Sequence, residues 1–275
     1  MNAHAAPFGA LLRRWREQRR LTQSDLALAA DSSTRHLSYL ETGRSQPSRE
    51  MIMRLSEYLQ IPLRERNLLL LAAGFAPAFQ ERSLAELEVA KDAIERILKA
   101  HLPYPAFAVD RHWYVVLSNS ALPQLYEGCS AELLRAPVNA MRLILDPAGM
   151  GARVVNFAQW RAHSLSLLRQ QIDARPDPVL QGLLAEIAAY PLPRHGDAAN
   201  RFDAAERLAT PLIIATRLGT VSFLSTVTVF GTPNDVTLSE LALEMLFPAD
   251  EATLGIVQRM RREQSEAEVA DAAAS

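Results

Sequence analysis

The stretch LTQSDLALAADSSTRHLSYLETGRSQPS, residues 21–48, decides how the first part of this chain folds. Its pattern predicts two short helices joined by a tight turn. Thr22 with Asp25 three residues later is the pattern of a capping box at the start of the first helix. Ser32 or Ser33 suits the N-cap of the second helix, because a hydroxyl there can accept a hydrogen bond from a free backbone N–H.

The second predicted helix has two different faces. Leu37 and Leu40 point to one side. The other side carries short hydrogen-bonding side chains and one arginine: Thr34, Arg35, Ser38, Tyr39 and Thr42. Such a face suits the major groove of DNA, which admits one helix and whose base edges are read by arginine and hydroxyl groups. Gly43 is suited to end the helix.

These residues resemble the Cro/C1-type helix-turn-helix regulators, also called XRE-like, over roughly residues 8–62. The matching motifs are Leu21-Thr22-Gln23, Leu26-Ala27, Leu37-Ser38, Leu40-Glu41, Gly43-Arg44 and Pro47-Ser48. The resemblance implies a five-helix lambda-repressor-like domain. The family usually has glycine in the turn where this chain has Asp31. We expect the turn to form, because aspartate tolerates left-handed backbone better than most residues.

Position along these helices predicts the DNA contacts. The resemblance places Gln23 where the family contacts phosphate, and Arg44 is expected to meet phosphate after the end of the second helix. Side chains at the start of a recognition helix usually reach base edges. Tyr39 packs on the DNA backbone or a thymine methyl, or else only on the protein surface. The predicted DNA-binding residues are Gln23, Ser33, Thr34, Arg35, Ser38, Tyr39, Thr42 and Arg44.

The length of 275 residues is enough for two ordinary domains, and the charge is unevenly distributed. Residues 1–80 carry 11 arginines and 7 acidic residues, whereas the remainder carries 18 basic and 24 acidic residues. A basic first third fits a module that touches phosphates, although basic helix faces are often only solvated. No apolar run reaches the roughly 20 residues that span a bilayer. With no signal-peptide pattern and a single cysteine, Cys129, we expect a cytoplasmic protein without membrane contact.

Further helices are predicted on either side of the opening stretch. Their ranges are Phe8–Gln18, 49–60 with Ser48 as its cap, 62–74 and 84–100. Ala76-Pro77 is a suitable domain boundary. The helix at 84–100 either connects two domains or pairs with its copy in a dimer, and its sequence fits both.

The pattern changes after Pro105 to short β-rich runs. The predicted strands are Ala106–Val109, Trp113–Leu117, Leu212–Thr216, Val221–Phe230 and Glu240–Phe247. Residues 119–190 between them are predicted to be helical. A last helix is predicted from Asp250 to about Arg262, followed by a frayed tail.

The chain also resembles a subgroup of these regulators, the MmyB-like proteins. The motifs are Pro62 to Asn67, Ala72 to Pro77, Pro103-Tyr104-Pro105-Ala106, Trp113, Asn119, Phe230-Gly231-Thr232-Pro233 with Asp235, Glu240-Leu241 and Phe247-Pro248-Ala249-Asp250. The resemblance implies a PAS-like domain, with a five-stranded antiparallel sheet and covering helices, that holds a small apolar molecule such as a fatty acid. The expected parts are a helix-turn-helix domain at 1–80, a connecting or dimerisation helix at 81–102, the PAS-like domain at 103–265 and a flexible tail at 266–275.

A ligand of this kind would lie between one sheet face and the helices, in a mostly apolar pocket with few polar anchors. Candidate lining aromatics are Phe107, Trp113, Phe157, Trp160, Phe223 and Phe230, and the alternative is that they only fill the core. Arg161 lies in the middle of an apolar helical stripe that includes Met150 and Leu168. Because an unpaired buried charge is costly, Arg161 either binds a ligand carboxylate, reaches solvent or pairs with an internal acid.

Enzyme motifs are absent from the sequence: there is no HExxH, nucleophile elbow, Walker loop or paired CxxC. The six histidines show no close ligand spacing, so we expect neither catalytic residues nor a metal. Two function classes remain. The first is a ligand-responsive regulator that binds double-stranded DNA as a homodimer on a palindromic operator. The second is a DNA-binding regulator whose C-terminal domain only dimerises or binds a protein partner.

Overall fold

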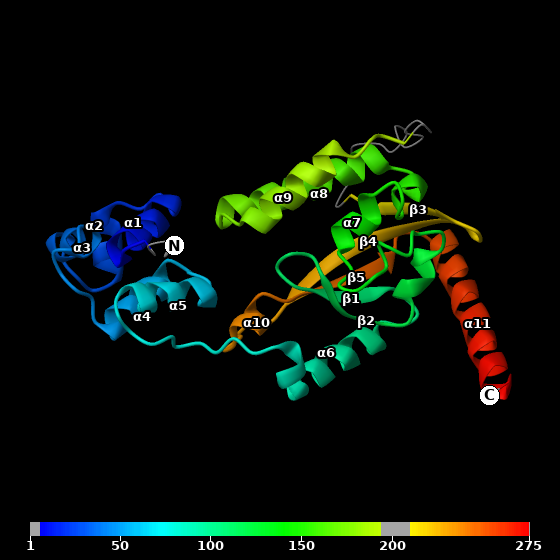
Figure 1. Ribbon diagram of the computed structural model, residues 1–275, viewed down its shortest axis with the longest axis horizontal. Helices are drawn as coiled ribbons and strands as arrows, with labels where there is room; N and C mark the ends of the chain where they lie inside the picture. Colours follow the sequence, from blue (N-terminus) through cyan, green and yellow to red (C-terminus); the bar gives the residue numbers. More distant parts are fainter. Residues whose placement is uncertain (1–5, 194–209, 275) are drawn as a thin grey trace. The chain divides into compact units, whose positions relative to one another are not determined.

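The computed structural model describes residues 6–193 and 210–274, with side chains described as far as residue 266 (Figure 1). The chain divides into two compact units. The first contains Met1–Glu86 together with a later segment, Phe230–Ser239. The second contains Leu87–Val229 and Glu240–Ser275. Each unit is described by itself below.

The first unit begins with five helices, as predicted. They are α1 (Phe8–Gln18), α2 (Gln23–Ala29), α3 (Thr34–Glu41), α4 (Arg49–Tyr58) and α5 (Leu63–Ala72). Each contributes apolar side chains to one core, which includes Leu12, Leu26, Leu37, Ile52 and Leu69. Burial of each such side chain stabilises the fold by roughly 1.5–3 kcal/mol. The core therefore holds α3 by its apolar face and leaves its polar face outside.

The predicted caps and turn of the opening stretch are confirmed. The Thr22 hydroxyl accepts a hydrogen bond from the Asp25 N–H, and the Asp25 side chain accepts one from the Thr22 N–H, which completes the capping box. Of the two candidate serines, Ser33 caps α3 by accepting from the His36 N–H. Asp31 has a φ of 49°, so the turn forms with aspartate in the left-handed region where the family usually has glycine.

The second unit contains a five-stranded antiparallel sheet in the order β2-β1-β5-β4-β3. The strands are β1 (Ala106–Val109), β2 (Val115–Ser118), β3 (Leu212–Thr216), β4 (Gly219–Val229) and β5 (Ala242–Pro248). β2 begins two residues later than predicted, because Trp113 has a φ of 70° and belongs to the turn. β5 also begins two residues later than predicted. The central strand β5 pairs with β1 on one side and β4 on the other.

Helices lie on both sides of this sheet. Figure 1 shows α7 (Ala140–Leu145), α8 (Phe157–Ala174) and α9 (Pro178–Ala189) on one side, and α6 (Glu88–Ala100) on the other. The predicted helix at 84–100 divides into a 3-10 turn, Leu84–Glu86, and α6. The last helix, α11, spans Glu251–Ala274. The prediction that it ends near Arg262 is therefore wrong. No helix in the described ranges is long and apolar enough to span a membrane.

Candidate functional site

α3 presents the polar face that the sequence predicts. Leu37 and Leu40 are buried on its back. On its front and flanks, the predicted DNA-binding residues Ser33, Thr34, Arg35, Thr42 and Arg44 are exposed, and Gln23, Ser38 and Tyr39 are half-buried. The Ser33 oxygen already accepts a bond as the cap of α3, and the Thr42 hydroxyl donates to the Ser38 carbonyl. The surface thus carries hydroxyl, phenol and guanidinium groups side by side.

Tyr39 organises the two arginines of this surface. The Arg35 Nε donates to the Tyr39 hydroxyl at 3.0 Å, and the Arg35 guanidinium carbon lies 5.4 Å from the centre of the Tyr39 ring. The Arg44 guanidinium carbon lies 6.0 Å from the same ring. These are cation–π distances. The bond to Tyr39 uses Nε of the exposed Arg35, and the terminal nitrogens of an arginine can read a guanine in a bidentate manner.

A buried ion pair that the sequence reading missed ties α1 to α3. The Arg16 guanidinium donates to both oxygens of Glu41, at 2.6 Å from Nε and 2.9 Å from Nη2, and to the Leu21 carbonyl at 2.8 Å. These hydrogen bonds, which Glu41 accepts, raise the pKa of Arg16. The Arg16 guanidinium is therefore used inside the protein and is not free to contact a DNA phosphate. Gln23 donates to the same carboxylate at 2.8 Å, so its amide is oriented before any DNA arrives.

Gly9 in α1 sets how closely the two helices approach. A Cβ at this position would lie 2.4 Å from the Glu41 carbonyl oxygen and 2.6 Å from that of Leu40. No side chain fits there without a backbone shift. The end of α3 is therefore positioned by a backbone-to-backbone contact in addition to the Arg16–Glu41 pair.

The Phe230–Ser239 segment belongs to the same unit as these helices. It contains a short helix, α10 (Val236–Ser239), and the fully buried Asp235. Asp235 accepts a hydrogen bond from the Arg82 Nε at 3.0 Å and one from the Thr237 N–H at 2.9 Å. The Val236 N–H donates to the Gln80 carbonyl at 2.8 Å. The loop between β4 and β5 is thus bound to the chain that follows α5.

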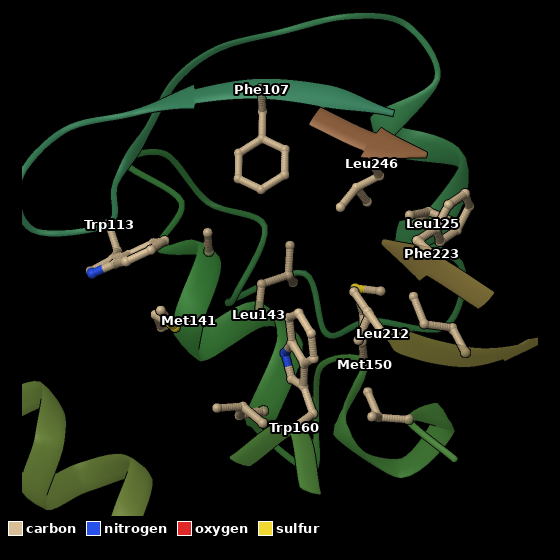
Figure 2. Close-up of a cluster of buried hydrophobic side chains, with 14 of the residues drawn as sticks. Phe107, Trp113, Leu125, Met141, Leu143, Met150, Trp160, Leu212, Phe223 and Leu246 are labelled. Atoms are coloured by element: carbon tan, nitrogen blue, oxygen red, sulfur yellow. The ribbon is translucent and has the colours of Figure 1, made fainter. Parts of the chain in front are cut away.

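The second unit contains a cavity of about 240 Å³. This is just below the roughly 300–1,000 Å³ usual for ligand pockets. Its wall is mostly apolar and comes from the sheet and from α7 and α8. Figure 2 shows side chains converging from these elements, with Phe107 of β1 pointing toward Leu143 and Trp160. The space between sheet and helices is therefore not filled by side chains.

Three of the predicted aromatic residues, Phe107, Trp113 and Trp160, line this cavity. Phe157 and Phe223 are buried in the surrounding core and are not part of the wall. Phe230 belongs to the first unit, since β4 ends at Val229 and the loop to β5 follows. The structure thus brings half of the six aromatics together around one space.

Arg161 is not part of the cavity wall, so of its predicted alternatives the structure does not place it beside a ligand carboxylate, and the half-buried side chain reaches the surface instead. Its Nη1 donates to the Tyr190 carbonyl at 2.8 Å and its Nη2 to the Ala188 carbonyl at 3.3 Å. These carbonyls are at the C-terminal end of α9, where a guanidinium satisfies free acceptors and meets the negative end of the helix dipole. The predicted stripe assumed one helix through Met150, but α8 begins only at Phe157.

Polar groups of the wall include Tyr126, His163, Ser164, Ser225 and Glu244. Glu244 accepts a hydrogen bond from the Ser225 hydroxyl, and burial raises the pKa of its carboxyl. Burial also raises the pKa of Tyr126 and lowers that of His163. Sequence reasoning missed Glu244, although it alternates with Leu243 and Met245 and so had to face the opposite side of β5. In the described residues, no group of three or more His, Cys, Asp or Glu side chains could hold a metal ion.

Comparison with known families gives two matches. A helix-turn-helix family model matches residues 12–66. A model described as the MmyB-like transcription regulator ligand binding domain matches residues 90–260, which is more than half of the chain. A search of curated proteins finds no match. The first match covers the surface built on α3, and the second covers every residue of the cavity wall.

Proposed function

The chain belongs to the MmyB-like transcription regulators, and on that premise we propose that it reads an operator through α3 and responds to a small apolar ligand in the cavity of its second unit. The cavity is the observation that carries the proposal. A module that only dimerises or binds a protein partner would be expected to fill this space with side chains, because protein interiors are close-packed. The cavity therefore favours a sensor over that alternative.

In this proposal the start of α3 faces the base edges. Arg35 pairs with a guanine, and the hydroxyls of Thr34 and Ser38 bond to neighbouring edges. The phosphates are contacted by Arg44, Gln23 and Thr42. Tyr39 holds Arg35 in place for the base contact and Arg44 for the phosphate contact. The protein acts as a homodimer on a palindromic operator in the cytoplasm, with two copies of α3 about one DNA turn apart.

The second unit is PAS-like in this proposal, and its antiparallel order with helices over the cavity supports that assignment. A fatty acid remains the candidate ligand, since an acyl chain would suit the apolar wall. A ligand changes the activity only if it binds two arrangements of the protein unequally. β4 and β5 both contribute to the wall, and the chain between them is the segment that Asp235 binds to the first unit. We propose this segment as the route of the signal.

Native mass spectrometry of the freshly purified protein tests the ligand, with organic extraction of whatever is released. The expected result is a discrete lipid-sized adduct on each protomer that is lost on denaturation. The same spectra report whether the protein is a dimer. A clean apo mass, combined with no binding when fatty acids are added back, would contradict the sensor proposal and leave the partner-binding alternative.

A further inference from the structure

Glu244 places one carboxyl in the apolar wall of the cavity. It lies on the central strand β5, opposite Phe107 of β1 and Val227 of β4, and only 6% of the residue is exposed. Its Oε2 accepts a hydrogen bond from the Ser225 hydroxyl. Within the described part of the chain, this is the one hydrogen bond that the carboxyl receives. The other oxygen, Oε1, has no protein donor there and keeps some accessible surface, so it can meet a water or a ligand.

A carboxyl oxygen in such a place needs a donor that is not part of the wall. Burying a polar group without a hydrogen bond is costly, and the cost is greatest for the ionised form. Water or a ligand hydroxyl can supply the donor, and a hydroxyl can also accept a bond from a protonated carboxyl. A hydroxyl therefore satisfies Glu244 in either protonation state.

The same wall is unfavourable for a ligand carboxylate, which needs a cationic partner. None of the wall residues that the structure describes is a lysine or arginine. Arg161, the cation predicted for this role, is bonded to the Tyr190 and Ala188 carbonyls. Two carboxyls in one apolar site disfavour each other's ionised form. An ionised acid would thus bring a second negative charge close to Glu244. The wall residue that could carry a positive charge is His163, and burial lowers its pKa, which favours the neutral ring.

The opening of the cavity is consistent with a head group at this place. Val227 and His163 belong to the wall and yet keep much of their surface exposed. Val227 pairs directly with Glu244 in the sheet. The acid is therefore near the open side, whereas Leu143, Met150 and Leu212 supply an apolar interior.

We propose that Glu244, held by Ser225, is the head-group site of this cavity, and that the cavity selects an apolar chain bearing a hydroxyl over one bearing an ionised carboxylate. The inference rests on the proposed function, because it takes the cavity to be the ligand site. It narrows the ligand class to alcohol-type amphiphiles. A fatty acid enters this site as the un-ionised acid, whose O–H is also a donor.

Three probes with the same chain test the assignment on the full-length protein: 1-octanol, its methyl ether and octanoate. Titration calorimetry gives the affinities, and the fluorescence of Trp113 and Trp160 reports binding because both line the cavity. Octanol should bind about tenfold more tightly than its ether, which lacks the donor, and more tightly again than octanoate. A tenfold difference is what one modest hydrogen bond provides. Equal affinity for octanol and its ether would overturn the head-group assignment.

Two variants test whether the Glu244 carboxyl, and not the apolar wall in general, sets the octanol-to-octanoate affinity ratio. Glu244→Gln keeps the size of the side chain and adds an N–H donor, so the disadvantage of octanoate relative to octanol should shrink about tenfold. Glu132→Gln removes an exposed acid outside the wall and should leave the ratio unchanged. An unchanged octanol-to-octanoate ratio in Glu244→Gln would overturn the proposal.

The three probes distinguish a wrong ligand site from a wrong role of Glu244. If none of the three probes binds, the cavity is not the ligand site and the proposed function itself fails. If all three bind alike, the cavity site stands and only the role of Glu244 is wrong. The comparison of probes on the unaltered protein needs no variant, so misfolding of a variant cannot obscure it.

Discussion

Removal of the Glu41 carboxylate should destabilise the first unit far more than removal of a surface acid. In the pair with Arg16, the Glu41 side chain is 3% exposed and the Arg16 side chain 10% exposed. Breaking a buried pair by removing one partner costs roughly 3–5 kcal/mol, because the other charge stays buried. Arg16 keeps its bond to the Leu21 carbonyl, so we expect about 3 kcal/mol for Glu41→Gln. Total stabilities are only about 5–15 kcal/mol.

Urea unfolding followed by circular dichroism measures this loss in the free energy of unfolding of the first unit. Glu57→Gln is the matched control, because Glu57 is an exposed acid of the same unit outside the Arg16–Glu41 pair, and it should change stability by less than about 1 kcal/mol. The double variant Arg16→Met with Glu41→Leu should recover most of the loss, since well-packed apolar residues can replace a buried pair. Stability of Glu41→Gln within about 0.5 kcal/mol of the unaltered protein would refute the reasoning, as would a double variant no more stable than the single one.

Three further predictions follow from the same geometry. Gly9→Ala should destabilise the protein by about 1–3 kcal/mol in thermal unfolding, because its Cβ would lie 2.4 and 2.6 Å from backbone oxygens. The control Gly182→Ala has nothing within 4 Å of its Cβ, in an exposed part of α9, and should stabilise by up to about 1 kcal/mol; equal effects of the two variants would contradict the packing argument. On sites obtained by in vitro selection, Arg35→Ala should cost about 1–3 kcal/mol and relax base preference, whereas Arg44→Ala should weaken all sequences alike and reduce the salt slope; an unchanged preference in Arg35→Ala would exclude Arg35 as a base reader. Asp235→Ala should cost about 1–3 kcal/mol and speed proteolysis of the loop between β4 and β5, which limited trypsin digestion followed by mass spectrometry measures. Asp92→Ala, which removes an exposed acid of α6, should leave the rate of loop cleavage unchanged, and equal rates in the two variants would contradict the role of Asp235.

Most of the helix-turn-helix part of the first unit could be predicted, because the sequence patterns that define it are local. The Thr22 capping box, the Ser33 cap and the left-handed Asp31 each depend on residues within a few positions. The helices they delimit then place the polar face of α3 by periodicity alone. The Arg16–Glu41 pair escaped prediction because the two residues are 25 positions apart, and nothing in the sequence distinguishes a buried arginine from its solvated neighbours.

The cavity was less predictable for the same reason. Strand alternation divides β5 into two faces, but only packing decides which face borders the cavity, and Glu244 is on that face. Arg161 was misplaced because the end of α9, which receives its hydrogen bonds, comes about 30 residues later in the chain. Phe230 looked like a strand residue, but the strand stops one residue earlier, at Val229.

The attachment of Phe230–Ser239 to the first unit has a consequence for hybrid regulators. A chimera is usually built by cutting in the linker between a DNA-reading module and a sensor and joining the halves of two relatives. Here such a cut would transfer Phe230–Ser239 with the sensor, although these ten residues belong structurally to the first unit. The loop from the other relative would then pack against the Gln80–Arg82 segment of this chain, for which its sequence is not matched. Arg82 would lose Asp235, its buried partner. A working exchange therefore has to carry this loop and residues 80–82 together as one matched pair.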